Sequence, residues 1–241
     1  MLRLAAALLL AILPGFVLAE EKPTTGFLEK KFKNADGTES PYVVFVPKDY
    51  DGKKEYPVIL FLHGSGETKG GTKAPVDVGI GPAIKKREKD FPFIVVIPQS
   101  EKRTWKADSD DGKRALAILD EVMKQYKTDA KRQYLTGLSM GGSGTWSIAP
   151  TTATRWAAIA PICGHGDIAD VEKIKGIPCW SFVGDKDSEK TVNNMKEMSE
   201  ALEKAGAKPK HTIYPGVGHN SWDAAYDTDD LYKWLLEQRT K

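Results

Sequence analysis

Short, continuous apolar runs alternate along the chain with longer segments in which apolar residues recur every three or four positions. Such a continuous run is typical of a strand that is buried on both faces of a sheet. We therefore predict about eight strands, at residues 27–32, 42–46, 57–62, 93–97, 133–137, 156–162, 179–183 and 211–214. The turn signal Asn-Ala-Asp-Gly at 34–37 separates the first two, which should form an antiparallel hairpin.

Helical periodicity fills the spaces between the later strands. Residues 112–126, 191–205 and 228–238 each carry one apolar stripe, and a further helix should begin near Met140. Strands that alternate with helices join through right-handed crossovers. The pattern predicts an α/β fold with a mainly parallel sheet and helices on both faces. No repeat or long linker divides residues 20–241, which we expect to form one domain.

The first nineteen residues differ from the rest. A positively charged start precedes an apolar run from Leu4 to Ala19, which Pro14-Gly15 interrupts. As a helix this run would span about 24 Å, less than the ~30 Å hydrocarbon core of a bilayer. The small residues at its end and the following Glu20-Glu21 are typical of a cleavable signal peptide. We expect residues 1–19 to be removed and the protein to be secreted or periplasmic, without a stable membrane anchor.

Composition and charge exclude several classes of protein. Hydrophobic residues make up 41% and charged residues 28%, an ordinary globular balance. The net charge of +2 provides no strong positive electrostatic field to attract the phosphate backbone of a nucleic acid. Cys163 and Cys179 should lie at opposite ends of neighbouring parallel strands, about 15–20 Å apart at ~3.3 Å per residue. A disulfide needs Cα atoms within about 7 Å, so we expect two unpaired thiols.

The segment Gly-Leu-Ser-Met-Gly at 137–141 follows a predicted strand and precedes a predicted helix. In this context G-x-S-x-G holds its serine in a strained, sharply turned conformation that lifts the hydroxyl above the sheet edge. Ser139 is therefore the candidate nucleophile. The alternative is a glycine-rich turn that contains an incidental serine.

A serine hydroxyl is a weak nucleophile and needs a base within hydrogen-bond reach. His219 lies on a loop between the last predicted strand and the last predicted helix, a position that suits an exposed base. His63 ends a buried strand, where an imidazole usually organises the backbone, and His211 lies inside a strand pattern. His165 also follows a strand and stays a second candidate.

The orienting carboxylate should follow the serine and precede the histidine along the chain. Asp185 and Asp187 both follow the strand at 179–183. The loop needs room to project a carboxylate toward the histidine, which favours Asp187. Asp185 could equally hold the loop through backbone amides.

Acyl transfer also requires donors for a tetrahedral oxyanion. The backbone N–H of Met140, at a helix N-terminus, is one candidate, and that of Ser65, in the glycine-rich loop after the third strand, is the other. Gln99 and Trp105 follow a parallel strand on the carboxyl edge, where ligands bind in such sheets, so we name both as candidate substrate-binding residues. For Trp105, packing beneath a loop is an equal alternative.

Five segments in this order resemble the α/β-hydrolase superfamily. They are His-Gly-Ser-Gly-Glu at 63–67, Pro98-Gln99 with Trp105, Gly-Leu-Ser-Met-Gly-Gly-Ser-Gly-Thr-Trp at 137–146, Gly-Asp-Lys-Asp at 184–187 and Gly-His-Asn at 218–220. The chain is most similar to exported esterases grouped with phospholipase/carboxylesterase, dienelactone hydrolase and polyhydroxybutyrate depolymerase, and feruloyl and acetyl xylan esterases share the layout. The resemblance implies an α/β-hydrolase fold, a Ser139–Asp187–His219 triad and an oxyanion hole from Ser65 and Met140. His165 departs from it, since glycine is expected there.

These observations together predict a serine carboxylesterase that works through an acyl-enzyme and needs no cofactor or metal. The substrate would be a carboxylic ester, either a small molecule or a polysaccharide- or polyester-linked group. A serine peptidase or thioesterase on the same fold is the first alternative. A catalytically silent binding module is the second.

Overall fold

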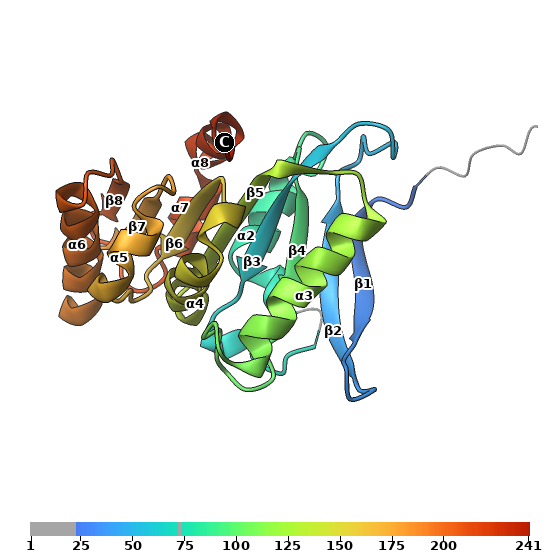
Figure 1. Ribbon diagram of the computed structural model, residues 1–241, viewed down its shortest axis with the longest axis horizontal. Coiled ribbons are helices and arrows are strands. Elements are labelled where there is room, and N and C mark those ends of the chain that lie inside the picture. Colours follow the sequence, from blue (N-terminus) through green and yellow to red (C-terminus); the bar gives the residue numbers. More distant parts are fainter. Residues whose placement is uncertain (1–22, 72–73) are drawn as a thin grey trace, which may run out of the picture.

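The computed structural model describes residues 23–71 and 74–241, and the predicted signal peptide at 1–19 lies outside the described residues. An eight-stranded sheet forms the centre of the molecule, in the order β1-β2-β4-β3-β5-β6-β7-β8 (Figure 1). The strands are β1 Gly26–Lys33, β2 Glu39–Val46, β3 Tyr56–Leu62, β4 Ile94–Pro98, β5 Thr128–Leu138, β6 Ala158–Ile162, β7 Trp180–Gly184 and β8 Lys210–Tyr214. β1 and β2 form the predicted antiparallel hairpin, β2 is also antiparallel to β4, and all other neighbours are parallel.

Helices cover both faces of this sheet, as predicted (Figure 1). α3 Asp110–Gln125, α4 Met140–Ile148, α5 Val171–Ile174 and α6 Glu189–Lys204 pack on one face. α1 Ala74–Asp77, α2 Ile80–Arg87, α7 Trp222–Asp227 and α8 Asp229–Glu237 pack on the other. Short 3₁₀ turns lie at Ser65–Glu67, Ala149–Thr151, Ala153–Arg155 and Ile168–Asp170. The α/β-hydrolase fold expected from the sequence is the fold observed.

Side-chain alternation along the central strands divides the apolar core into two layers. In β3 every residue is buried: Leu60 and Leu62 belong to the layer beneath α3 and α4, whereas Ile59 and Phe61 belong to the layer beneath α2 and α7. Successive side chains of a strand point to opposite faces, so a strand that is covered on both sides reads as a continuous apolar run. This is why the apolar runs located the strands.

β5 extends furthest beyond its apolar run. β5 begins at Thr128, five residues before the predicted start at 133, because Thr128 pairs with Tyr56 of β3 ahead of the apolar stretch. Residues 128–132 are mostly polar, and only the tertiary pairing makes them part of a strand. Periodicity carries no signal for such an extension.

The two cysteines are buried and unpaired, as expected. Cys179 pairs across the sheet with Ile159, four positions before Cys163, which corresponds to roughly 13 Å at ~3.3 Å per residue. Within residues 23–71 and 74–241, no helix has the length and apolar character needed to cross a bilayer.

The contact between α4 and the carboxyl end of β3 is close enough to require glycine. A Cβ atom at Gly141 would overlap the carbonyl oxygen of Leu62, whereas a Cβ atom at Gly176 would meet no atom within 4 Å. We predict that Gly141→Ala lowers the free energy of unfolding by about 3 kcal/mol or more, since overpacking moves backbone as well as side chains. The matched change Gly176→Ala should alter it by less than ~1 kcal/mol. Urea unfolding of both variants checks this, and equal midpoints would contradict the packing described.

Candidate active site

Ser139 occupies a strained turn between β5 and α4. Its backbone angles are φ 53° and ψ −113°, a positive φ that residues with a side chain rarely adopt. Its N–H donates to the carbonyl of Ile162 at 2.9 Å, and its own carbonyl accepts from the N–H of Ser143 at 3.0 Å. The turn is thus tied to β6 on one side and to α4 on the other.

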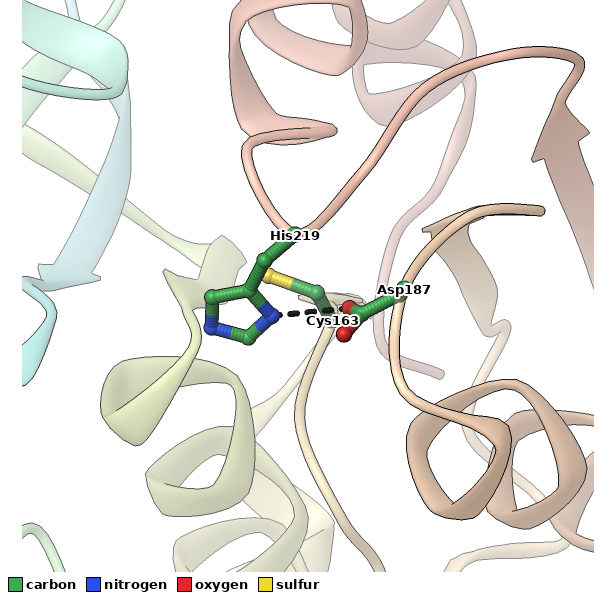
Figure 2. Close-up of side chains that lie close together, drawn as sticks. All are labelled: Cys163, Asp187 and His219. Carbon is green, nitrogen blue, oxygen red and sulfur yellow. Dashed lines mark hydrogen bonds and ion pairs between the residues drawn. The ribbon is translucent and has the colours of Figure 1, made fainter.

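His219 lies within hydrogen-bond distance of both Ser139 and Asp187. The distance from His219 Nε2 to Ser139 Oγ is 2.8 Å, and that from His219 Nδ1 to Asp187 Oδ2 is also 2.8 Å. Figure 2 shows the His219 ring with Nδ1 directed at the Asp187 carboxylate. The Asp187 side chain is 4% exposed and that of His219 is 48% exposed. A buried carboxylate holds the proton on Nδ1 and leaves Nε2 free to accept the Ser139 hydroxyl proton.

The loop that carries His219 is braced by its neighbours. The Trp222 ring meets the His219 ring edge-on, with centroids 5.6 Å apart. The N–H of Lys186 donates to the carbonyl of Val217 at 2.9 Å, and a Cβ atom at Gly184 would overlap the same carbonyl. The loop after β7 and the loop after β8 therefore lie against each other.

The two aspartates after β7 have different partners. Asp185 Oδ1 accepts from the N–H of Gly216 at 2.7 Å and so holds the histidine loop. Asp187 Oδ1 accepts from the N–H of Ser188 at 2.6 Å, which leaves Oδ2 directed at His219. Asp187 is thus the aspartate that bonds to His219, and Asp185 is the one that bonds to the backbone of the histidine loop.

A buried polar network holds the glycine-rich loop after β3. His63 Nδ1 donates to the carbonyl of Gly64 at 2.6 Å, and His63 Nε2 accepts from the N–H of Ser100 at 3.0 Å. Burial lowers the pKa of His63 to about 4, so the ring is neutral at neutral pH and can accept at Nε2. A Cβ atom at Gly64 would lie 2.7 Å from Leu138 Cδ1, so this loop touches the residue before Ser139.

Gln99 and Trp105 support this loop from within the protein. Each is 2% exposed, which contradicts the predicted contact with substrate. Gln99 Nε2 donates to the carbonyl of Glu67 at 2.9 Å, and Trp105 Nε1 donates to the carbonyl of His63 at 2.9 Å. The Trp105 side chain also packs directly over Gly144 of α4. Both were correctly placed near the site, but they position backbone instead of lining a pocket.

Asp111 is a positioning residue that the sequence did not reveal. Its side chain is fully buried, and Oδ2 accepts from Ser100 Oγ at 2.7 Å and from the N–H groups of Glu101 and Lys102 at 3.0 and 2.7 Å. Arg114 pairs with its other oxygen. By sequence it is one of several acids at the start of a helix. Asp111 is buried because the loop after β4 folds over it, and the sequence pattern does not show this contact.

Cys163 is the second unpredicted neighbour of the site. Its sulfur lies behind the His219 ring, and the ligand atoms of Cys163, Asp187 and His219 are all within 4.8 Å of one another (Figure 2). These residue types could hold a metal ion. However, burial raises the pKa of the thiol to about 12, and Asp187 and His219 already bond to each other. The buried, protonated thiol therefore lies beside the hydrogen-bonded pair of Asp187 and His219.

The family model Esterase matches residues 34–240. The chain belongs to this esterase family. The match covers all five segments on which the sequence resemblance rests, including the Ser139, Asp187 and His219 positions.

Three relatives show how the similarity is distributed. A 98-residue stretch is 32% identical to the bifunctional acetylxylan esterase/xylanase XynS20E of Neocallimastix patriciarum and covers 39% of this chain. A 136-residue stretch, 55% of the chain, is 23% identical to "Probable feruloyl esterase C" of Aspergillus terreus. The chain spans only 15% and 48% of the lengths of these two proteins. The crystal structure of a thermostable esterase is similar with a TM-score of 0.81 and 32% identity, covering 88% of this chain and 63% of that one.

The neutral state of His63 gives this protein a testable pH dependence. An unfolded histidine titrates near pH 6.5, whereas His63 in the folded protein titrates near pH 4. Between these values the unfolded state binds a proton that the folded state does not, so stability falls as the pH falls. We predict that His63→Gln has a lower free energy of unfolding than the wild type at pH 7. Between pH 7 and 4.5, however, this free energy should fall by about 2–3 kcal/mol less in the variant than in the wild type.

Urea unfolding at several pH values measures this difference. The same substitution at His211, which is exposed and whose imidazole bonds to Ser199 Oγ, controls for loss of an imidazole elsewhere. Parallel stability curves for the wild type and His63→Gln would contradict a neutral, buried His63.

Proposed function

We propose that this protein is an exported serine carboxylesterase in which Ser139, His219 and Asp187 form a catalytic triad. The observation that carries the proposal is the continuous hydrogen-bonded chain from Asp187 through His219 to Ser139. It ends on a hydroxyl in the strained strand-to-helix turn that this kind of nucleophile requires.

The mechanism follows from the direction of these hydrogen bonds. His219 Nε2 takes the proton of the Ser139 hydroxyl as Oγ attacks the ester carbonyl, and the Asp187 carboxylate stabilises the imidazolium that forms. His219 then gives the proton to the departing alcohol, which leaves an acyl group on Ser139. Water, deprotonated by the same imidazole, releases the carboxylic acid and restores the hydroxyl.

The charge that develops on the carbonyl oxygen needs donors in place beforehand. The N–H of Met140 at the start of α4 and the N–H of Ser65 in the loop after β3 are our proposed pair. Support comes from the contact between Gly64 and Leu138 and from the buried network that fixes His63. Each donor of this kind contributes about 3 kcal/mol to the transition state.

The relatives narrow the class of substrate. Their names include an acetylxylan esterase and a feruloyl esterase, which favours an ester that is small or attached to a polysaccharide. Rates on a matched ester, thioester and peptide would distinguish the proposed activity from a thioesterase or peptidase. Labelling by a fluorophosphonate probe would separate any of these from a catalytically silent fold.

Substitutions in the triad test the proposal directly. Ser139→Ala should reduce kcat on p-nitrophenyl acetate by about 10⁴-fold or more, because the nucleophile is removed. Asp187→Asn should reduce it by about 10³–10⁴-fold, because the asparagine favours the wrong tautomer of His219. Asp185→Asn is the matched control and should cost less than ~10-fold, since Asp185 bonds the backbone at Gly216 and not His219.

Steady-state kinetics of the three purified variants provide the measurement. Undiminished turnover by Ser139→Ala would overturn the proposed function. A larger loss in Asp185→Asn than in Asp187→Asn would reverse the assignment of the two aspartates.

Export is proposed from the charged start and apolar run of residues 1–19 alone. We predict that a chain expressed with its own N-terminus in a bacterial host is recovered outside the cytoplasm with Glu20 as its first residue. Intact-mass measurement of the recovered protein checks this. A cytoplasmic protein that retains Met1 would contradict it.

A further inference from the structure

Ser100, the second residue after β4, bonds to the rest of the protein through its N–H, its carbonyl and its hydroxyl. It is completely buried. Its N–H donates to His63 Nε2 at 3.0 Å, and its carbonyl accepts from the N–H of Lys69 at 3.2 Å. Its hydroxyl donates to Asp111 Oδ2 at 2.7 Å. Ser100 therefore joins the loop after β3 to the first turn of α3.

Gln99 and Ser100 together hold the loop after β3 at three points. Ser100 bonds to the first and the last residue of the segment 63–69, and Gln99 Nε2 donates to the carbonyl of Glu67 at 2.9 Å. The N–H of Ser65, a proposed oxyanion donor, lies between these points. Such a donor has to be in place before the negative charge develops. The position of Ser65 therefore depends on where Gln99 and Ser100 are held.

The Asp111 carboxylate in turn holds Ser100. Besides the Ser100 hydroxyl, its Oδ2 accepts from the N–H groups of Glu101 and Lys102 at 3.0 and 2.7 Å. Arg114, which lies three residues further along α3 and is 11% exposed, pairs with the other oxygen. Hydrogen bonds to a charged group are strong, and a buried donor that loses its acceptor is costly. The start of the loop after β4 is thus fixed by one buried carboxylate.

We propose that Asp111 is a positioning residue for the oxyanion hole and acts through Ser100 on the loop that carries Ser65. The carboxylate bonds to the loop after β4, that loop bonds to the loop after β3, and the loop after β3 presents the donor. The inference rests on the proposed esterase function, and it extends the active site to a residue of α3. Its loss should weaken binding of the transition state more than binding of the substrate.

Asp111→Asn keeps the shape of the side chain and removes its charge. An amide carries one oxygen, so either Arg114 or the donors around Ser100 lose their acceptor. We expect kcat and kcat/KM on p-nitrophenyl acetate to fall together by about 10–100-fold, since the oxyanion donor is displaced and not deleted. KM should change by less than ~3-fold, because the lost interaction is made only in the transition state.

A pair of ketones reports on the oxyanion hole itself. With 1,1,1-trifluoro-2-heptanone, Ser139 Oγ forms a bond to the carbonyl carbon, the C=O π pair moves to the oxygen and the hydroxyl proton passes to His219 Nε2. The resulting oxyanion needs the same donors as the reaction. In Asp111→Asn the inhibition constant of this ketone should rise about 10–100-fold. That of 2-heptanone, which lacks the activating fluorines and binds without the new bond, should change by less than ~3-fold.

Ser100→Ala removes only the hydroxyl through which Asp111 holds this residue. We expect kcat/KM to fall and the inhibition constant of the fluoroketone to rise by about 3–10-fold. In the double variant the loss should exceed that of Asp111→Asn by less than ~2-fold, because both changes remove the same contact. Ser100→Ala also decides the question if Asp111→Asn does not fold.

Asp129 provides the matched control. It is buried, pairs with Arg132 three residues later at 2.8 Å and accepts from the N–H of Lys131 at 2.9 Å. It lies near the start of β5, however, at the edge of the sheet opposite Ser139. Asp129→Asn should lower the urea midpoint, as Asp111→Asn does, and should leave kcat/KM and both inhibition constants within ~2-fold of the wild type.

The outcomes distinguish this inference from the proposed function. If the wild type neither hydrolyses p-nitrophenyl acetate nor is inhibited by the fluoroketone, the esterase function itself fails. If the wild type is active, three results overturn only the role of Asp111. They are wild-type constants in Asp111→Asn or, where it does not fold, in Ser100→Ala, an equal loss of affinity for both ketones, and losses of the same size in Asp129→Asn.

Discussion

The backbone of Ser139, held at a positive φ between β5 and α4, is the constraint on which the site depends. A residue with a side chain adopts this conformation only when its surroundings compensate the strain of about 1–3 kcal/mol. Here the compensation comes from hydrogen bonds to β6 and α4 and from the contact of Gly141 with the end of β3. The hydroxyl is consequently held 2.8 Å from His219 Nε2.

A parallel sheet explains how distant residues meet at this hydroxyl. The carboxyl ends of β3, β5, β7 and β8 lie along one edge, and each is followed by a loop that contributes to the site. Ser139 and His219 are eighty positions apart in the chain, yet their side chains are 2.8 Å apart. The loops after β7 and β8 bond to each other through Lys186 and Val217, so the histidine is held in place before any substrate binds.

The surroundings of the site divide into two chemical environments. On the side of β3, His63, Gln99 and Ser100 are buried and bond to backbone groups, and the buried Asp111 carboxylate accepts from Ser100 Oγ and pairs with Arg114. Within the described residues, Gln99 Oε1, Glu67 Oε2 and Thr68 Oγ1 are also buried on this side without a hydrogen-bond partner. On the side of β6, the buried thiol of Cys163 lies near His219, and His165 lines a cavity along α4.

The apolar periodicity by itself determined the class of fold, the hairpin and the major strands and helices. A sheet that is covered on both faces requires continuous apolar runs, and amphipathic helices require an apolar residue every three or four positions. The serine motif and the chain order of its candidate partners also limited the site to a few residues. Only the tertiary structure decided several other features. They are the short helices α1 and α5, the polar start of β5, which of Asp185 and Asp187 bonds to His219, and the burial of Gln99, Trp105 and Asp111. The physical reason is that periodicity reports which face of an element is buried, whereas the direction of one polar side chain depends on loops that meet only after the sheet has formed.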